Sequence, residues 1–274
     1  MTLNCNGKLI DLSSPKVMGI LNVTPNSFFD GGKHTTEKAI LIQVEKMLFE
    51  GATFIDIGGN SSKPSAEFVS EEEELHRLIP VIQSVVKEFP SVVISADTFR
   101  SKVAKESIEN GAALINDISA GNLDAKMMET VAKLQVPYIM MHMKGTPQTM
   151  QSLAQYENIV KEILFYFSQK ISYARSLGIN DLILDPGFGF AKTLEQNFEV
   201  LSKLELFQMT ELPLLVGVSR KSMVYKTLET SAEFALNGTT SLNAISLLKG
   251  AKILRVHDVK EAFECIQLYN QLKK

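Results

Sequence analysis

The feature that most constrains the fold is a series of eight short apolar segments separated by stretches with helical periodicity. The segments read as strands buried on both faces, as in a parallel sheet covered by helices. They span residues 17–21, 53–57, 92–96, 113–115, 138–141, 182–184, 214–218 and 253–256. Eight strand–helix units in roughly 250 residues predict an α/β fold, a single (β/α)8 TIM barrel over residues 1–274. A doubly wound sheet would more often carry a Gly-x-Gly-x-x-Gly loop, which this sequence lacks.

Turn and cap signals support this alternation of strands and helices. Four helical stretches stop at a glycine that the next strand follows directly, and glycine is favoured there because the residue beyond a helix end adopts a left-handed conformation. These glycines are Gly51, Gly111, Gly178 and Gly250. Ser70 and Glu73 predict a capping box at the start of one helix. Asn6-Gly7 predicts a short β-hairpin over residues 4–10, ahead of the barrel.

Composition excludes several classes of partner. Lys and Arg number 28 and Asp and Glu 31, so the net charge of −3 provides no basic field for nucleic acid or an anionic membrane. No apolar run approaches the roughly 20 residues that span a bilayer, and the first residues do not resemble a signal peptide. We therefore expect a cytoplasmic protein without nucleic-acid or membrane partners. Cys5 and Cys265 lie near opposite ends and match no metal-ligand spacing, which predicts reduced thiols.

Polar residues follow nearly every predicted strand, where the loops of such a barrel build the active site. They are Asn22, Asp56, Asp97, Asn116, His142, Asp185, Ser219, Arg220, Lys221, Ser222, Arg255 and His257. Among them, Asp185 precedes Pro186, Gly187 and Gly189, a turn that lets backbone approach a ligand closely. The alternative for Asp185 is an Asx-turn that satisfies local amides only.

The chemistry of these residues suggests a heterocycle that carries phosphate. Asp97, Asp185 and the amide of Asn116 are suited to hydrogen-bonding the edge of a planar ring. Lys221, Arg255 and His257 bring positive charge to the last two strand ends, where barrels frequently bind phosphate. The alternatives are a solvated lysine for Lys221 and a helix-capping residue for His257.

The strand ends also carry sequence motifs that resemble those of the dihydropteroate synthase family, in the family order and nearly end to end. The motifs are VMGILNVTPNSFFDGG at 17–32, DIGG at 56–59, DT at 97–98, NDI at 116–118, DPGFGF at 185–190, SRKS at 219–222 and RVHD at 255–258. The resemblance implies a transferase of folate biosynthesis. It would join 6-hydroxymethyl-7,8-dihydropterin diphosphate to 4-aminobenzoate and release diphosphate in the presence of Mg²⁺.

The resemblance also implies roles for individual residues. The pterin ring would be held by Asp97, Asn116, Asp185 and Lys221, and diphosphate with its Mg²⁺ by Arg255, His257 and Asn22. Phe28, Phe190, Ser62, Pro64 and Ser222 would frame 4-aminobenzoate, and Asp30 would face the pterin cation. Lys221, Asp97, Asp30 and Arg255 would thus take part in catalysis. A homodimer and sensitivity to sulfonamides are further implications.

Some positions depart from the family pattern. Asn26 stands where the first loop usually has Asp, and the run at 60–65 is NSSKPS where ESTRPG is usual. Lys63 replaces a planar guanidinium by a point charge, and Ser65 replaces a glycine, so we expect weaker retention of the arylamine. Two other functions remain open. One is a pterin-binding paralogue without synthase activity, and the other is a methyltetrahydrofolate-dependent methyltransferase, which would not need the motifs at 219–222 and 255–258.

Overall fold

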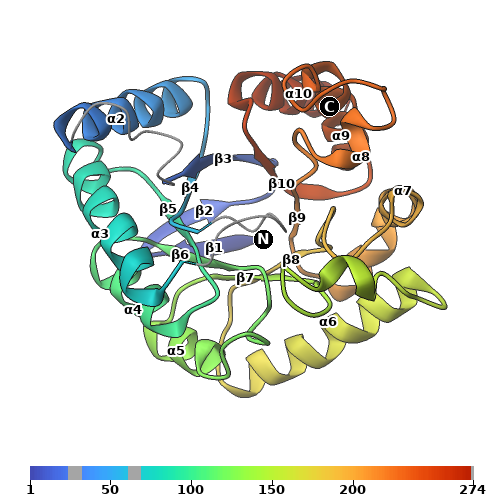
Figure 1. Ribbon diagram of the computed structural model, residues 1–274, viewed down its shortest axis with the longest axis horizontal. Coiled ribbons are helices and arrows are strands. Elements are labelled where there is room, and N and C mark those ends of the chain that lie inside the picture. Colours follow the sequence, from blue (N-terminus) through green and yellow to red (C-terminus); the bar gives the residue numbers. More distant parts are fainter. Residues whose placement is uncertain (24–32, 61–68, 273–274) are drawn as a thin grey trace.

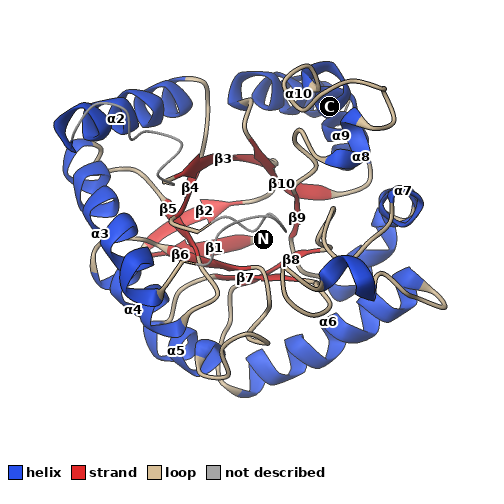
Figure 2. Cartoon of the chain, viewed as in Figure 1, coloured by secondary structure: helices blue, strands red, loops and turns tan. Residues whose placement is uncertain are grey.

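The computed structural model describes residues 1–23, 33–60 and 69–272. Its strands form a closed parallel barrel, and helices surround the barrel as a ring (Figures 1 and 2). The barrel order is β10-β3-β4-β5-β6-β7-β8-β9. The predicted TIM barrel is therefore confirmed.

Each barrel strand lies close to a segment predicted from the sequence. The strands are β3 (Lys16–Asn22), β4 (Phe54–Gly58), β5 (Ile94–Asp97), β6 (Leu114–Asp117), β7 (Tyr138–Met141), β8 (Leu182–Asp185), β9 (Leu214–Val216) and β10 (Ala251–Val256). The sequence predicts Asp97 and Asp185 just beyond two strands, but in the structure they are the last residues of β5 and β8. These carboxylates are thus held by the sheet itself at the rim of the barrel.

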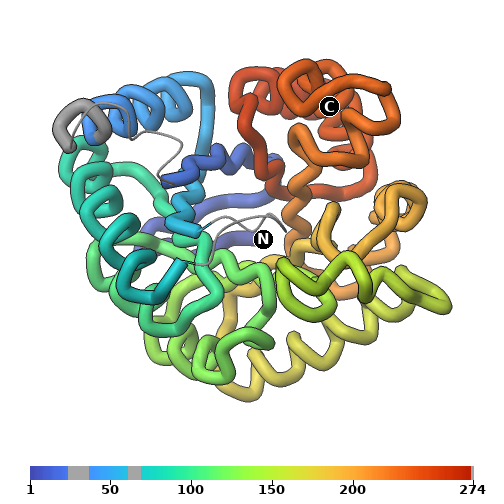
Figure 3. Tube along the Cα trace, in the orientation of Figure 1, coloured from blue at the N-terminus to red at the C-terminus, as the bar shows by residue number. Residues whose placement is uncertain are grey.

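Helices follow the strands in the order that the sequence predicts. They are α2 (Lys33–Phe49), α3 (Glu71–Glu88), α4 (Ser101–Glu109), α5 (Met127–Leu134), α6 (Ile159–Ser176), α7 (Leu194–Ser202), α8 (Ser222–Tyr225), α9 (Leu236–Leu248) and α10 (Val259–Gln271), with 3-10 turns η1 (Met150–Leu153) and η2 (Leu204–Thr210). The four predicted cap glycines all have positive φ, between 85° and 111°. Figure 3 shows the closure of the barrel, where the C-terminal strand β10 pairs with β3 near the N-terminus.

The predicted capping box on α3 forms only in part. The Ser70 side chain accepts a hydrogen bond from the amide of Glu73, as expected. The Glu73 carboxylate instead accepts from Arg77 Nε at 2.7 Å, one helical turn along the exposed face. The reciprocal half of the prediction is therefore wrong, because an ion pair with Arg77 competes for the same carboxylate.

The N-terminal hairpin closes one end of the barrel. Strands β1 (Thr2–Cys5) and β2 (Lys8–Asp11) pair through the Asn6-Gly7 turn, in which both residues have positive φ. Leu3, Ile10 and Leu12 pack with apolar residues from the beginnings of the barrel strands, such as Phe54 of β4. The hairpin thus seals the amino ends of the strands and leaves the carboxyl ends for the site.

Two further predictions concern thiols and membranes. Cys5 and Cys265 are buried and free, as predicted. Within the described ranges, no helix combines the length and the apolar character that crossing a membrane requires.

Candidate active site

A cavity of about 570 Å³ opens at the carboxyl ends of the strands. Seven of the residues to which the sequence resemblance assigns a role line it: Asn22, Asp97, Phe190, Lys221, Ser222, Arg255 and His257. They come from the ends of β3, β5 and β10 and from the loops that follow β8 and β9. The barrel closure therefore brings together residues that lie more than 200 positions apart in the sequence.

One wall of the cavity is a network centred on Arg255. Its Nε donates to Asp56 Oδ2 at 2.6 Å, and its Nη2 donates to Asp97 Oδ2 at 2.7 Å. The Asp56 side chain is fully buried, so a single guanidinium bridges a buried and a partly exposed carboxylate. Nη1 has no hydrogen-bond partner among the described residues, which leaves it free for an anionic ligand.

The ionisation of this network follows from its burial. Removal from water, and then the neighbouring Asp56 carboxylate, raise the pKa of Asp97 to about 7, against the opposing effect of Arg255. Burial by itself would lower the pKa of Arg255, but Asp56 and Asp97 raise it above its ordinary value. Arg255 is therefore a permanent cation beside two carboxylates.

Asp56 also orients Asn116. The Asn116 Nδ2 donates to Asp56 Oδ2 at 3.1 Å, so the amide oxygen of Asn116 remains available to a ligand donor. Asp56 Oδ1 is buried and has no partner within the described part of the chain. The motifs assign no role to Asp56, although its position at the end of a strand was the signal that could have identified it.

Asp185 lies deeper, with 5% of its surface exposed. Its Oδ1 accepts from the amide of Gly187 at 2.7 Å, so the Asx-turn alternative accounts for this oxygen. Oδ2 has no hydrogen-bond partner among the described residues and can accept from a ligand. Burial raises the pKa of Asp185, whereas Lys221 lowers it.

Lys221 is held against the loop that follows β8. Its Nζ donates to the carbonyl oxygen of Phe188 at 2.5 Å and lies 4.9 Å from the centre of the Phe190 ring. Burial lowers its pKa to about 8. The alternative of a solvated lysine is wrong, because these contacts hold the ammonium group inside the site.

His257 lies at the rim of the cavity beside Ser219. The Ser219 Oγ lies 3.0 Å from His257 Nδ1 and also accepts from the backbone amide of His257 at 3.1 Å. Asp258, not His257, precedes the first residue of α10, so the capping alternative for His257 is wrong. Arg220 also lines the cavity, and its guanidinium forms two hydrogen bonds with Asp258.

The residues of the cavity are compatible with the magnesium ion that the sequence resemblance implies. Within residues 1–23, 33–60 and 69–272, no group of three His, Cys, Asp or Glu side chains could hold a metal ion. Asn22 lines the cavity and offers one amide oxygen. Mg²⁺ prefers oxygen ligands and usually binds one or two protein groups together with phosphate and water, so one protein ligand is compatible with it.

Four of the predicted site residues lie outside the described residues: Phe28, Asp30, Ser62 and Pro64. The departures at Asn26, Lys63 and Ser65 also lie there, and their expected effects stay predictions.

Comparison with known proteins agrees with the architecture of the site. A family model described as "Pterin binding enzyme" matches residues 18–257. The dihydropteroate synthase of Haemophilus influenzae is 43% identical over 98% of both chains. A crystal structure of the Yersinia pestis dihydropteroate synthase in a sulfonamide complex is 43% identical, with a TM-score of 0.93 over 100% of this chain and 99% of that one. The Xanthomonas albilineans dihydropteroate synthase with 4-aminobenzoic acid is 36% identical, with a TM-score of 0.92 over 99% and 98% of the two chains. The chain belongs to the dihydropteroate synthase family of pterin-binding enzymes.

Proposed function

We propose that the protein condenses 6-hydroxymethyl-7,8-dihydropterin diphosphate with 4-aminobenzoate to give 7,8-dihydropteroate and diphosphate. The observation that carries the proposal is the arrangement around Arg255, where carboxylate acceptors and cations share one cavity. A methyltransferase would have no use for the cationic end of this cavity, because its folate substrate carries no diphosphate.

The pterin ring would bind among Asp97, Asn116, Asp185 and Lys221. The free Oδ2 of Asp185 and the amide oxygen of Asn116 would accept from ring N–H and amino groups, while the Lys221 ammonium would donate to a ring acceptor. Because the Asp185 and Asn116 side chains are at least 95% buried, a mismatch there would leave polar groups unpaired.

The diphosphate would bind at the other end of the cavity. Arg255 Nη1 would donate to phosphate oxygens, and His257 lines the same cavity. Asn22 would hold Mg²⁺ together with the diphosphate, and the ion would neutralise charge on the leaving group when bound. Because Arg255 Nη1 bonds to neither Asp56 nor Asp97, a phosphate would bind there without breaking either ion pair.

The reaction replaces a C–O bond by a C–N bond. The C–O bond to diphosphate breaks with both electrons leaving on oxygen, and the arylamine nitrogen then attacks the pterin methylene carbon and loses a proton. Asp97 and Asp185 would stabilise positive charge on the pterin as the bond breaks, and Arg255 would stabilise the departing anion. Lys221 would fix the ring orientation during this exchange.

Fewer of the residues that would bind 4-aminobenzoate lie in the described part of the chain. Phe190 and Ser222 line the cavity and would contact 4-aminobenzoate. Phe28, Ser62, Pro64 and Asp30 would complete this side, as the sequence resemblance implies. A homodimer, a cytoplasmic location and inhibition by sulfonamides belong to the same proposal.

The deciding experiment measures diphosphate release from the pterin substrate with Mg²⁺, with and without 4-aminobenzoate. A synthase should release diphosphate in step with the formation of dihydropteroate, and only when the arylamine is present. Tight pterin binding without product would identify the pterin-binding paralogue instead. Methyl transfer from methyltetrahydrofolate, with no diphosphate released, would identify the methyltransferase.

A further inference from the structure

We propose that Lys192 is a positioning residue that holds the loop between β8 and α7 in the shape that the pterin subsite requires. Lys192 does not line the cavity, and 3% of its surface is exposed. The inference rests on the proposed function, because this loop follows Asp185 of the site and carries Phe190.

The ammonium group of Lys192 occupies the centre of this loop. Its Nζ donates to the carbonyl oxygens of Gly187 at 2.9 Å and Phe190 at 3.1 Å, and it lies 3.1 Å from His142 Nδ1. These three contacts use the three N–H groups of an ammonium. One side chain therefore joins both ends of a tight turn to the end of β7.

The same contacts are satisfied in either protonation state of Lys192. Burial lowers the pKa of Lys192 to about 7, with Asp185 opposing and Lys221 and Lys144 adding to the effect. Burial also holds the pKa of His142 well below its ordinary value, so the imidazole is neutral. A neutral Lys192 can still donate to both carbonyls and accept from His142 when that ring carries its proton on Nδ1. The three contacts of Lys192 Nζ therefore form whether Lys192 or His142 Nδ1 carries the proton between them.

The loop that Lys192 fixes is directly connected to the site. Within it, the Phe188 carbonyl oxygen accepts from Lys221, and the Phe190 ring lies beside the same ammonium group. Gly187 N donates to Asp185, the residue whose other oxygen would accept from pterin. A side chain at Gly187 would collide with the carbonyl oxygen of His142, so the loop has little space in which to shift.

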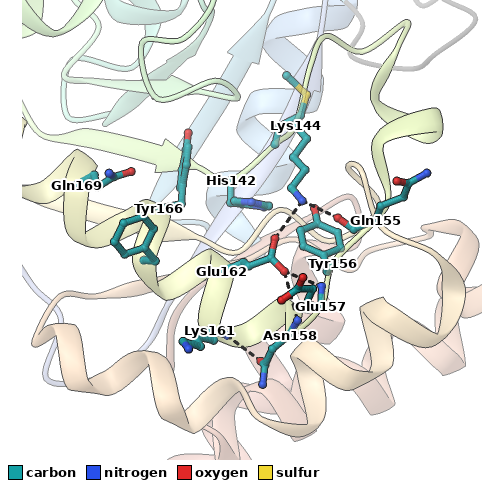
Figure 4. A pocket seen from close by; sticks show the side chains of 12 residues that line it. His142, Lys144, Gln155, Tyr156, Glu157, Asn158, Lys161, Glu162, Tyr166 and Gln169 are labelled. Atoms are coloured by element: carbon teal, nitrogen blue, oxygen red, sulfur yellow. Dashed lines mark hydrogen bonds and ion pairs between the residues drawn. The ribbon is translucent and has the colours of Figure 1, made fainter.

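Neighbouring side chains brace the loop from outside but do not replace Lys192. Tyr156 Oη donates to the Ala191 carbonyl oxygen at 2.8 Å, and Asn197 Oδ1 accepts from Gly189 N at 2.7 Å. Figure 4 shows Tyr156 and His142 in an outer groove with Lys144, whose Nζ lies 3.6 Å from the Tyr156 ring centre and pairs with Glu162. None of these side chains reaches the Gly187 or Phe190 carbonyls.

The first experiment compares Lys192→Met with Lys144→Met. Methionine retains much of the apolar stem and removes the nitrogen, so the Phe190 carbonyl oxygen loses its donor and the Gly187 carbonyl oxygen keeps only the amide of Phe190. The variant no longer buries a charged group, which offsets part of the cost of the lost hydrogen bonds. We expect kcat/KM for the pterin diphosphate to fall by roughly 10- to 100-fold while the melting temperature holds. The control Lys144→Met removes a lysine from the outer groove and should retain the parent's kcat/KM.

A second pair of variants tests the contact between Lys192 and His142 by changing His142. His142→Asn retains a group that can accept or donate near the position of Nδ1, whereas His142→Leu offers neither. Hydrogen exchange of peptides covering residues 186–192 should be faster in Lys192→Met and His142→Leu than in the parent and in His142→Asn. This readout needs no substrate, so it stays decisive if the parent makes no dihydropteroate and the proposed function fails.

Two results would overturn the proposal. One is unchanged exchange in this loop in both Lys192→Met and His142→Leu. The other is a loss of melting temperature in Lys192→Met with no change in pterin affinity or in kcat/KM, which would make Lys192 a structural residue only. If Lys192→Met does not fold, the two His142 variants decide the question by the same comparison.

Discussion

At the scale of single residues, Asp185 uses its two carboxylate oxygens for different purposes. Oδ1 accepts from Gly187 and shapes the turn, and Oδ2 has no partner among the described residues. The Asx-turn and the ligand contact therefore coexist in one side chain, and they can be separated by a substitution that retains one oxygen.

The Asp185→Asn variant is expected to fold and to bind pterin more weakly. Asparagine can keep the acceptor for Gly187, but it presents an N–H group where an acceptor is needed, which leaves a buried ring donor unpaired. We expect a loss of about 2 kcal/mol in binding, near thirtyfold in Kd. Isothermal calorimetry with the free pterin provides the measurement, and an unchanged Kd would remove Asp185 from the subsite.

The Arg255→Ala variant should separate the binding of the diphosphate group from the binding of the pterin ring. The diphosphate ester should lose roughly 1.5–3 kcal/mol of binding, because its charged hydrogen bonds disappear, while the free pterin alcohol should lose much less. The free energy of unfolding should also decrease, because the buried Asp56 carboxylate loses its counter-ion. Arg255→Lys serves as the control that keeps the charge without the planar fork. Equal losses for the two ligands would show that Arg255 shapes the pocket in general.

At the scale of elements, helix α7 begins directly after the loop that carries Phe190. Thr193 Oγ1 accepts from Gln196 N at 3.2 Å, and Gln196 Oε1 accepts from Thr193 N at 2.9 Å. This reciprocal capping box fixes the point at which the loop ends and the helix starts. The equivalent prediction for α3 was half right, because the sequence pattern alone did not reveal the competing Arg77.

The Thr193→Ala variant should therefore lower the free energy of unfolding by about 1 kcal/mol through loss of the cap. Urea denaturation followed by circular dichroism measures this change. Ser168→Ala in the middle of α6, where the hydroxyl bonds only the Phe165 carbonyl oxygen among the described residues, should change it by less than about 0.5 kcal/mol. A Thr193 variant as stable as the Ser168 variant would show that the cap contributes nothing.

At the scale of the whole molecule, the barrel holds titratable groups whose pKa values differ from those of the unfolded chain. Lys192 has a pKa of about 7 in the folded state, against an ordinary value of 10.5. The folded state therefore binds this proton more weakly than the unfolded state. The contribution of Lys192 to stability must rise with pH between about 7 and 10.5, and it is lost as pH falls through 7.

Comparison of Lys192→Met with the parent should reveal this dependence. The free energy of unfolding of the variant relative to the parent should be highest near pH 6–7, where the parent must bury an ammonium group. The difference should shrink as pH rises toward 10. Chemical denaturation at a series of pH values measures it, and a difference independent of pH would mean that Lys192 has an ordinary pKa.

The sequence alone determined the architecture and most of the rim of the site. Short apolar segments and cap glycines report local backbone preferences, so eight strands, the Asn6-Gly7 hairpin and strand-end residues such as Asp97 and Arg255 could be identified from periodicity. The family motifs then implied binding and catalytic roles for these residues, which the spacing of the apolar segments could not indicate.

Only the tertiary structure decided which of these side chains meet. Arg255 pairs with Asp56 across 199 positions, and Lys192 contacts His142 across 50. These pairings exist because a closed barrel places the end of β10 beside β3, one strand from Asp56 on β4, and the loop after β8 beside the end of β7. Sequence periodicity carries no information on such contacts, since side-chain direction and burial are fixed only when the barrel closes.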